Sequence, residues 1–133
     1  MDIAILKINS KDKRIEYAGA NRPLYHISNG KLNEIKPTKL PIGGVEAGKE
    51  KKFESVHLQL NSGDMIYLST DGYADQFGGE KNKKITTKKF KAILESISGK
   101  QVEEQEKYLL ESFNAFKGAS EQTDDVLVAG IRF

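Results

Sequence analysis

Cysteine is absent from the 133-residue chain, and its absence excludes several kinds of site at once. Without cysteine the chain cannot form disulfides, thiolate metal sites or a cysteine nucleophile. Such a composition fits a cytoplasmic protein, and we expect that location. Long apolar runs are lacking too: none approaches the roughly 20 residues of a membrane span, and Met1-Asp2 does not begin a secretory signal. We therefore expect no membrane contact from this segment.

The excess of positive charge is small. A net charge of +2, in a chain with 30% charged residues, argues against nucleic acid as the main partner. Lysines nevertheless gather in one segment, which runs Glu80-Lys81-Asn82-Lys83-Lys84 and continues with Lys88, Lys89 and Lys91. This segment is either a solvated loop and the outer face of a helix, or a surface that docks an acidic partner, phosphate or RNA.

Apolar residues that alternate with polar ones predict a series of strands in the first half of the chain. We expect them at residues 2–9, 14–20, 24–28, 31–36, 53–60 and 65–70. Asn29-Gly30 separates two of these runs and predicts a tight hairpin, because both residues tolerate a positive φ.

In the second half of the chain, the spacing of the apolar residues changes from that of strands to that of helices. Apolar residues recur at helical spacing from Phe90 to Ile97, where Thr86 or Thr87 can cap the start and Gly99 can end the helix. A second helix is expected at about 102–116. The apolar run at 126–133 predicts a strand that is covered on both faces. Strands, two helices and a strand together predict one α+β domain over residues 1–133, with the helices packed on antiparallel β-sheet.

Histidine is scarce, so the candidates for chemistry are mainly carboxylates. His26 and His57 are the two histidines, and each is expected on the surface or as a satisfied structural residue. Neither has a neighbour that would complete a nucleophilic triad. We therefore expect no catalytic residue that acts independently of a metal site.

Asp71 ends a hydrophobic strand and is followed directly by Gly72. A carboxylate at a strand end is held by a rigid element, and such oxygen ligands suit hard cations like Mg²⁺ and Mn²⁺. Asp71 can equally cap the turn that follows. Both interpretations remain open from this segment alone.

Asp124 and Asp125 immediately precede the last apolar run. Adjacent acids repel one another near a core unless a cation or hydrogen-bond donors compensate them. A solvated turn between helix and strand is the simpler interpretation of this pair. The segment between Asp71 and Asp124 contains both expected helices. If the chain after these helices rejoins the same sheet, the two acids lie at one edge of it.

Four segments resemble the type 2C protein phosphatase (PPM) superfamily, and within it the SpoIIE-like bacterial phosphatases. They occur in the family's order and cover essentially the whole chain. In chain order, the segments are Tyr17-Ala18-Gly19-Ala20-Asn21-Arg22-Pro23-Leu24-Tyr25, Leu40-Pro41-Ile42-Gly43, Gly63-Asp64-Met65-Ile66-Tyr67-Leu68-Ser69-Thr70-Asp71-Gly72 and Asp124-Asp125-Val126-Leu127-Val128.

The resemblance implies a partial β-sandwich phosphatase fold and hydrolysis of phosphoserine and phosphothreonine with two Mn²⁺ or Mg²⁺ ions. By similarity Asp71 and Asp124 are metal ligands, and Gly72 allows a sharp turn beside the metal. Asp75 and Asp125 are supporting acids. The implied partner is a phosphorylated regulatory protein in a bacterial signal-transduction pathway.

One departure from the family is clear. The family's catalytic centre begins with an earlier Asp-Gly pair, whereas this chain has Asp-Gly only at Asp71-Gly72. We therefore expect a partial domain that lacks its amino-terminal portion, with activity belonging to the parent protein. The alternative is a phosphatase-like module without catalysis, which binds a partner or forms a homodimer through sheet edges left open.

Overall fold

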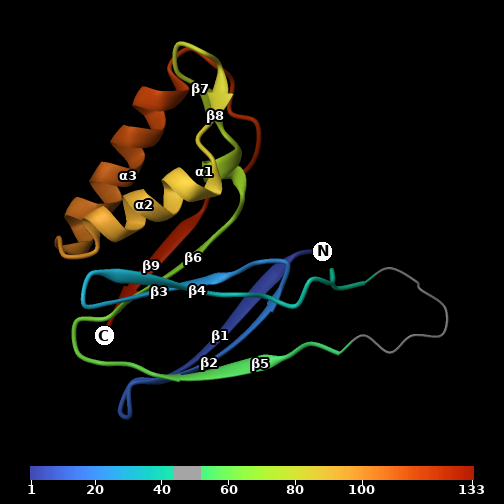
Figure 1. Cartoon of the computed structure of the whole chain (residues 1–133), viewed down its shortest axis with the longest axis vertical. Helices are drawn as coiled ribbons and strands as arrows, with labels where there is room; N and C mark the ends of the chain where they lie inside the picture. The colour runs from blue at the N-terminus through green and yellow to red at the C-terminus, as the bar shows by residue number, and fades with distance from the viewer. Residues whose placement is uncertain (44–51) are drawn as a thin grey trace.

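The structure is a computed structural model, and it describes residues 1–43 and 52–133. The chain forms three layers, which Figure 1 shows as two sheets with the helices stacked above the second one. The first sheet has the order β1-β2-β5, from β1 (Ile3–Asn9), β2 (Arg14–Ala20) and β5 (Ser55–Gln59). The second has the order β4-β3-β6-β9, from β3 (Leu24–Ser28), β4 (Lys31–Ile35), β6 (Met65–Ser69) and β9 (Val128–Arg132).

The expected α+β class and the antiparallel strand pairing are confirmed. The strand limits agree with expectation within one or two residues. The Asn29-Gly30 hairpin forms as predicted, with φ values of 50° and 72° at the two turn residues.

The helical layer contains two main helices and one short one. They are α1 (Gly72–Asp75), α2 (Thr87–Ile97) and α3 (Val102–Lys117). The side chain of Thr86 caps α2 by accepting from the Lys89 amide, as the sequence predicted. A hairpin of two-residue strands, β7 (Phe77–Gly78) and β8 (Lys83–Lys84), precedes α2. The sequence analysis did not predict α1 or this hairpin, because neither is long enough to show a period.

Two cores separate the three layers. The core between the sheets is built from Ile15, Tyr17, Leu24, Leu60 and Ile66. The core between the second sheet and the helices includes Tyr25, Ile27, Met65, Tyr67, Tyr73, Phe90, Leu94 and Phe113. Successive residues of a strand face opposite sides, so β6 sends alternate side chains into each core.

The prediction of a last strand covered on both faces is wrong. The strand begins at Val128 rather than residue 126. It lies at the edge of its sheet, where β6 is its one partner strand among residues 1–43 and 52–133. Ala129, Gly130 and Arg132 are exposed. Composition could not show that β9 is an edge strand. The central strand β6 is equally apolar, yet it lies between two strands and has both faces covered.

The two histidines behave as expected. His26 is satisfied, since its Nε2 lies 2.9 Å from Oδ2 of the buried Asp64. His57 is exposed, with its Nε2 3.7 Å from Oε1 of Glu16. In the described parts of the chain, no helix combines the length and apolar character needed to cross a bilayer.

Candidate functional site

The segments that carry the predicted acids meet where β6 ends and β9 begins. In the antiparallel register Ser69 pairs with Val128, so the chain leaving β6 runs beside the chain entering β9. The amide of Thr70 donates to the carbonyl of Leu127 at 3.0 Å, and the amide of Leu127 donates to Thr70 Oγ1 at 2.9 Å. The strand pairing thus continues beyond the last ladder residues toward the acids.

Gly72 allows the two segments to approach closely. A Cβ at this position would overlap the carbonyl oxygen of Asp125. Thr70 Oγ1 donates to that same oxygen at 2.8 Å. The close approach of the two backbones therefore requires a glycine at this position.

The carboxylate of Asp71 is held by an arginine from another part of the chain. Arg22, in the loop between β2 and β3, places Nη2 2.6 Å from Asp71 Oδ2 and 3.1 Å from Asp2 Oδ2. Asn21 Nδ2 donates to the other oxygen of Asp2 at 3.0 Å. Hydrogen bonds from Asn21 and, to a smaller extent, from Arg22 hold the pKa of the Asp2 carboxyl below its ordinary value. One guanidinium thus joins the chain terminus to the end of β6.

The backbone around Arg22 is fixed by its own contacts. Tyr17 donates its hydroxyl hydrogen to the carbonyl of Arg22, and a Cβ at Gly19 would overlap both groups. Asn21 has a φ of 58° and donates its amide to the carbonyl of Thr38 at 2.9 Å. The sequence analysis did not identify Arg22 or Asp2 as site residues. The Asn21-Arg22-Pro23 loop, which it did record, was the available signal.

Of the remaining candidate acids, Asp124 and Asp125 are exposed and Asp75 is half-buried. Asp124 Oδ1 accepts from the amide of Asp125 at 2.7 Å, so the pair folds locally into a turn. The Asp75 carboxylate lies 3.1 Å from Lys84 Nζ and is therefore engaged by a lysine. Asp71 also begins α1, but its side chain makes no capping hydrogen bond, so the predicted turn-capping role is absent.

These acids are the right type of ligand for a hard divalent cation, but too few of them lie together to complete its coordination. Carboxylate oxygens on strand ends are the ligands that Mg²⁺ and Mn²⁺ prefer. Within residues 1–43 and 52–133, however, no group of three or more histidines, cysteines, aspartates or glutamates is close enough to hold a metal. Asp71 and Asp124 can thus supply only part of a coordination shell, and their role as ligands stays a prediction.

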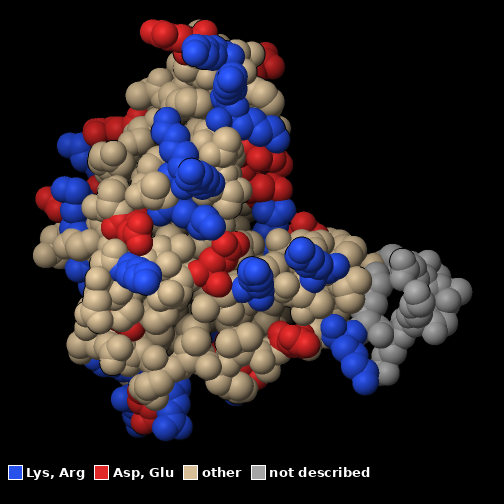
Figure 2. Space-filling view, in the orientation of Figure 1, with Lys and Arg blue, Asp and Glu red and all other residues tan. Residues whose placement is uncertain are grey.

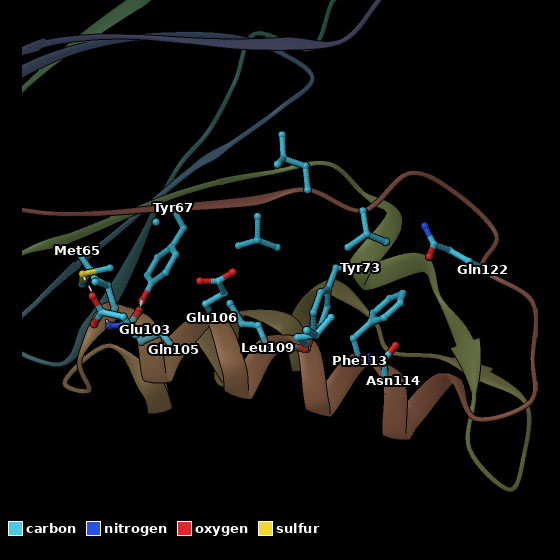
Figure 3. Close-up of a pocket in the computed structure, with 16 residues that line it drawn as sticks. Met65, Tyr67, Tyr73, Glu103, Gln105, Glu106, Leu109, Phe113, Asn114 and Gln122 are labelled. Carbon is cyan, nitrogen blue, oxygen red and sulfur yellow. Dashed lines mark hydrogen bonds between the residues drawn. The ribbon is translucent and has the colours of Figure 1, made fainter.

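A groove lined by both apolar and polar side chains borders the same loop. Its volume is about 620 Å³, and it lies between α3 and the strands β6 and β9. Figure 3 shows Tyr67, Tyr73 and Phe113 along it, with Gln122 at the end nearest the acid-bearing loop. Leu110 and Leu127, which also line it, are 61% and 62% exposed. The groove thus carries exposed leucines beside β9, which is an edge strand among the described residues.

Comparison with known proteins gives a consistent result. A family model described as "Stage II sporulation protein E (SpoIIE)" matches residues 1–133. The SiaA-PP2C domain of Pseudomonas aeruginosa is 26% identical with a TM-score of 0.89, over 99% of this chain and 51% of that chain. The PP2C phosphatase domain of SpoIIE from Bacillus subtilis, solved with a fragment of its regulatory domain, is 20% identical with a TM-score of 0.75, over 99% and 37%.

A second SpoIIE phosphatase-domain structure from Bacillus subtilis, presoaked with manganese, is 16% identical with a TM-score of 0.70, over 98% of this chain and 56% of that chain. No curated protein sequence matches the chain. The chain thus spans about half the length of the solved phosphatase domains that it matches.

Proposed function

Because this chain belongs to the SpoIIE family, we propose that it is the carboxy-terminal portion of a metal-dependent phosphoserine and phosphothreonine protein phosphatase domain. The parent protein then dephosphorylates a bacterial regulatory protein in the cytoplasm. The observation that carries this proposal is the meeting of the Asp71-Gly72 and Asp124-Asp125 segments at the end of β6 and the start of β9.

Asp71 and Asp124 are the proposed metal ligands, with Asp75 and Asp125 as supporting acids and Gly72 as the residue that permits the close approach. Two Mn²⁺ or Mg²⁺ ions, when bound, would activate a shared water and stabilise the charge on the phosphoryl oxygens. The other ligands would come from the part of the domain that this chain does not span. Such a shared site fits the low number of acids found together here.

Arg22 holds the Asp71 carboxylate in place within this proposal. Its guanidinium compensates Asp71 and Asp2, so that two acids can lie on the same side of the molecule without repelling one another strongly. A cation that binds Asp71 must share the carboxylate with Arg22 or displace it. The arginine therefore also influences how tightly this part of the site binds metal.

The test is hydrolysis of a phosphoserine peptide by the complete domain in the presence of Mn²⁺. Asp71→Asn and Asp124→Asn should each lower the rate by roughly 100-fold or more, since losing even outer-shell partners of a metal costs 10–100-fold. Asp12→Asn, in the exposed turn between β1 and β2, is the matched control and should keep full activity. Full activity in both site variants would contradict the assignment.

A second candidate function rests on a separate observation, the exposed leucines beside β9. Another chain can pair with the edge strand β9 and pack on the exposed leucines of the neighbouring groove. As a module without catalysis, the chain would dimerise as concentration rises and would not bind Mn²⁺. Sedimentation and calorimetry on the same sample distinguish this candidate from the phosphatase.

A further inference from the structure

The lysine-rich segment that the proposed function leaves unused divides into two parts in the structure. Lys91 pairs with Glu34 of β4 at 2.9 Å and is half-buried. The other lysines of the segment are exposed around the β7–β8 hairpin and the first turn of α2. We call them the lysine surface, and they are Lys81, Lys83, Lys84, Lys88 and Lys89.

The lysine surface is attached directly to the turn that carries Asp71. Lys84 Nζ lies 3.1 Å from the Asp75 carboxylate, and the amide of Asp75 donates to the carbonyl of Asp71 at 2.9 Å. The chain after β8 is bonded to the end of α1, with Thr86 donating its amide to Ala74 at 2.8 Å. The surface therefore begins about one helical turn away from the proposed metal ligand.

The hairpin that presents these lysines is held against the end of α3. Gly79 donates its amide to the carbonyl of Phe116 at 2.9 Å, and a Cβ at Gly78 would overlap that carbonyl. Lys89 Nζ lies 4.9 Å from the centre of the Phe116 ring, which draws its charge toward the hairpin. The backbone of the hairpin is thus fixed against the end of α3.

Most of this charge is not compensated by the protein itself. In the described part of the chain, Lys81, Lys83 and Lys88 have no carboxylate within 4.0 Å, and Lys84 has only Asp75. Figure 2 shows lysine and arginine side chains at the end of the molecule where Figure 1 places β7 and β8, with acidic side chains beside them. Uncompensated exposed charges of one sign attract a ligand of the opposite sign.

We propose that the lysine surface binds an acidic stretch of the phosphorylated protein on which the neighbouring site acts. This inference rests on the proposed function, and it names the recognition chemistry of that site: glutamate and aspartate side chains close to the phosphorylated residue. A protein ligand fits better than nucleic acid, because the net charge of the chain is only +2. In addition, the exposed aromatic Phe77 has Lys84 over its ring at 5.6 Å, so it is not free for base stacking.

The experiment measures fluorescence anisotropy of labelled peptides titrated with this chain. One phosphoserine peptide is rich in glutamate, and a second of equal length has lysine in place of every glutamate. An oligothymidylate of similar net charge is the third probe. We expect the acidic peptide to bind more tightly than either of the others, and its affinity to fall as salt rises, because exposed charges are screened over about 10 Å at 0.1 M salt.

Matched triple variants locate the binding surface. Lys81→Gln/Lys83→Gln/Lys88→Gln should weaken binding of the acidic peptide roughly tenfold, since each exposed charge contributes modestly. Lys7→Gln/Lys11→Gln/Lys31→Gln removes the same charge from β1, the β1–β2 turn and β4, and it should change the affinity less than about twofold. Circular dichroism checks that both variants fold.

Three results would overturn the proposal: equal weakening in the two triple variants, no weakening in either, or tighter binding of the oligothymidylate than of the acidic peptide. Hydrolysis of p-nitrophenyl phosphate by the complete domain keeps this test separate from the proposed function. That small substrate carries no acidic side chains for the lysine surface to bind, so the first triple variant should hydrolyse it at the wild-type rate. Loss of hydrolysis would instead report damage to the metal site.

Discussion

At the scale of single residues, Arg22 links more of the candidate site than any acid does. It contacts Asp2 and Asp71, which are far apart in the sequence, and its own carbonyl is held by Tyr17. Exposed ion pairs usually contribute little to stability, but this arginine side chain is only 21% exposed and has two acidic partners. We therefore expect it to be coupled energetically to Asp71.

The first prediction concerns that coupling. Arg22→Met and Asp71→Asn should each lower the free energy of unfolding, by roughly 1 kcal/mol for the partly exposed arginine. The double variant should lose less than the sum of the two, because the pair is already broken by either change. Urea unfolding measures all three, with Arg14→Met as the control. Simple additivity would show that the contact does not contribute.

The second prediction concerns the buried Asp64. Burial alone would raise the pKa of its carboxyl, but hydrogen bonds from the Asn61 amide, His26 and Ser28 together hold that pKa below 3.8. A depressed folded-state pKa adds stability that is present above pH 3.8 and is lost as the pH falls through the lower value. Asp64→Asn should cost about 2 kcal/mol at neutral pH and should flatten the acid side of the stability profile. If the free energy of unfolding of the variant falls with acid pH as steeply as that of the wild type, the prediction is wrong.

At the scale of secondary-structure elements, the site depends on how closely the β6–α1 turn and the loop before β9 approach each other. Gly72 is the point of contact, since a Cβ there would overlap the backbone of Asp125. Two backbones cannot move apart without disturbing the hydrogen bonds between Thr70 and Leu127. The junction is therefore rigid, and both acids are carried by it.

The third prediction tests this junction. Gly72→Ala should lower the free energy of unfolding by about 2 kcal/mol, as overpacking does, and should weaken Mn²⁺ binding by the complete domain. Gly99→Ala is the matched control, because nothing lies within 4 Å of the added Cβ and its φ is not positive. That change should leave stability unchanged or raise it by up to about 1 kcal/mol. Equal effects at the two glycines would exclude the close approach as the cause.

Much of the element order could be predicted from the sequence because it depends on local signals. The Asn29-Gly30 turn, the Thr86 cap and the helical period from Phe90 to Ile97 each specify structure within a few residues. The position of β9 at a sheet edge and the ion pair between Arg22 and Asp71 could not be predicted in this way. Both depend on which distant segments become neighbours, and composition does not report that.

At the scale of the whole molecule, four buried tyrosines are divided between the two cores. Tyr17 lies between the sheets, whereas Tyr25, Tyr67 and Tyr73 lie between the second sheet and the helices. Burial raises the pKa of each of these hydroxyls to about 12. Ionising any of them would place a charge in an apolar core, so the folded state favours their neutral form.

The fourth prediction follows from the sign of these shifts. A pKa raised from 10.0 to about 12 adds stability that is present below pH 10 and is lost as the pH rises toward 12. The measurement uses a Tyr108→Phe variant, because Tyr108 is 43% exposed and would add its own absorbance. In that variant we expect one cooperative alkaline unfolding, in which the absorbance of the four buried tyrosines and the loss of far-ultraviolet circular dichroism coincide. Ionisation of these tyrosines while the circular dichroism stays native would contradict the buried arrangement.

The chain as a whole carries one part of a proposed metal site, at a junction that also borders the lysine surface and the groove. The proposed metal site, the lysine surface and the groove would then lie close together, where β6 ends and β9 begins (Figure 1). The account depends most on Asp71 and Asp124 binding the same divalent cation.

Calorimetric titration of the complete domain with Mn²⁺ tests that claim most directly, using wild type, Asp71→Asn, Asp124→Asn and the double variant. Each single change should lower Mn²⁺ affinity by at least roughly tenfold, and the double variant should lose less than the two losses combined, because both ligands serve one ion. Wild-type affinity in both single variants would contradict the account.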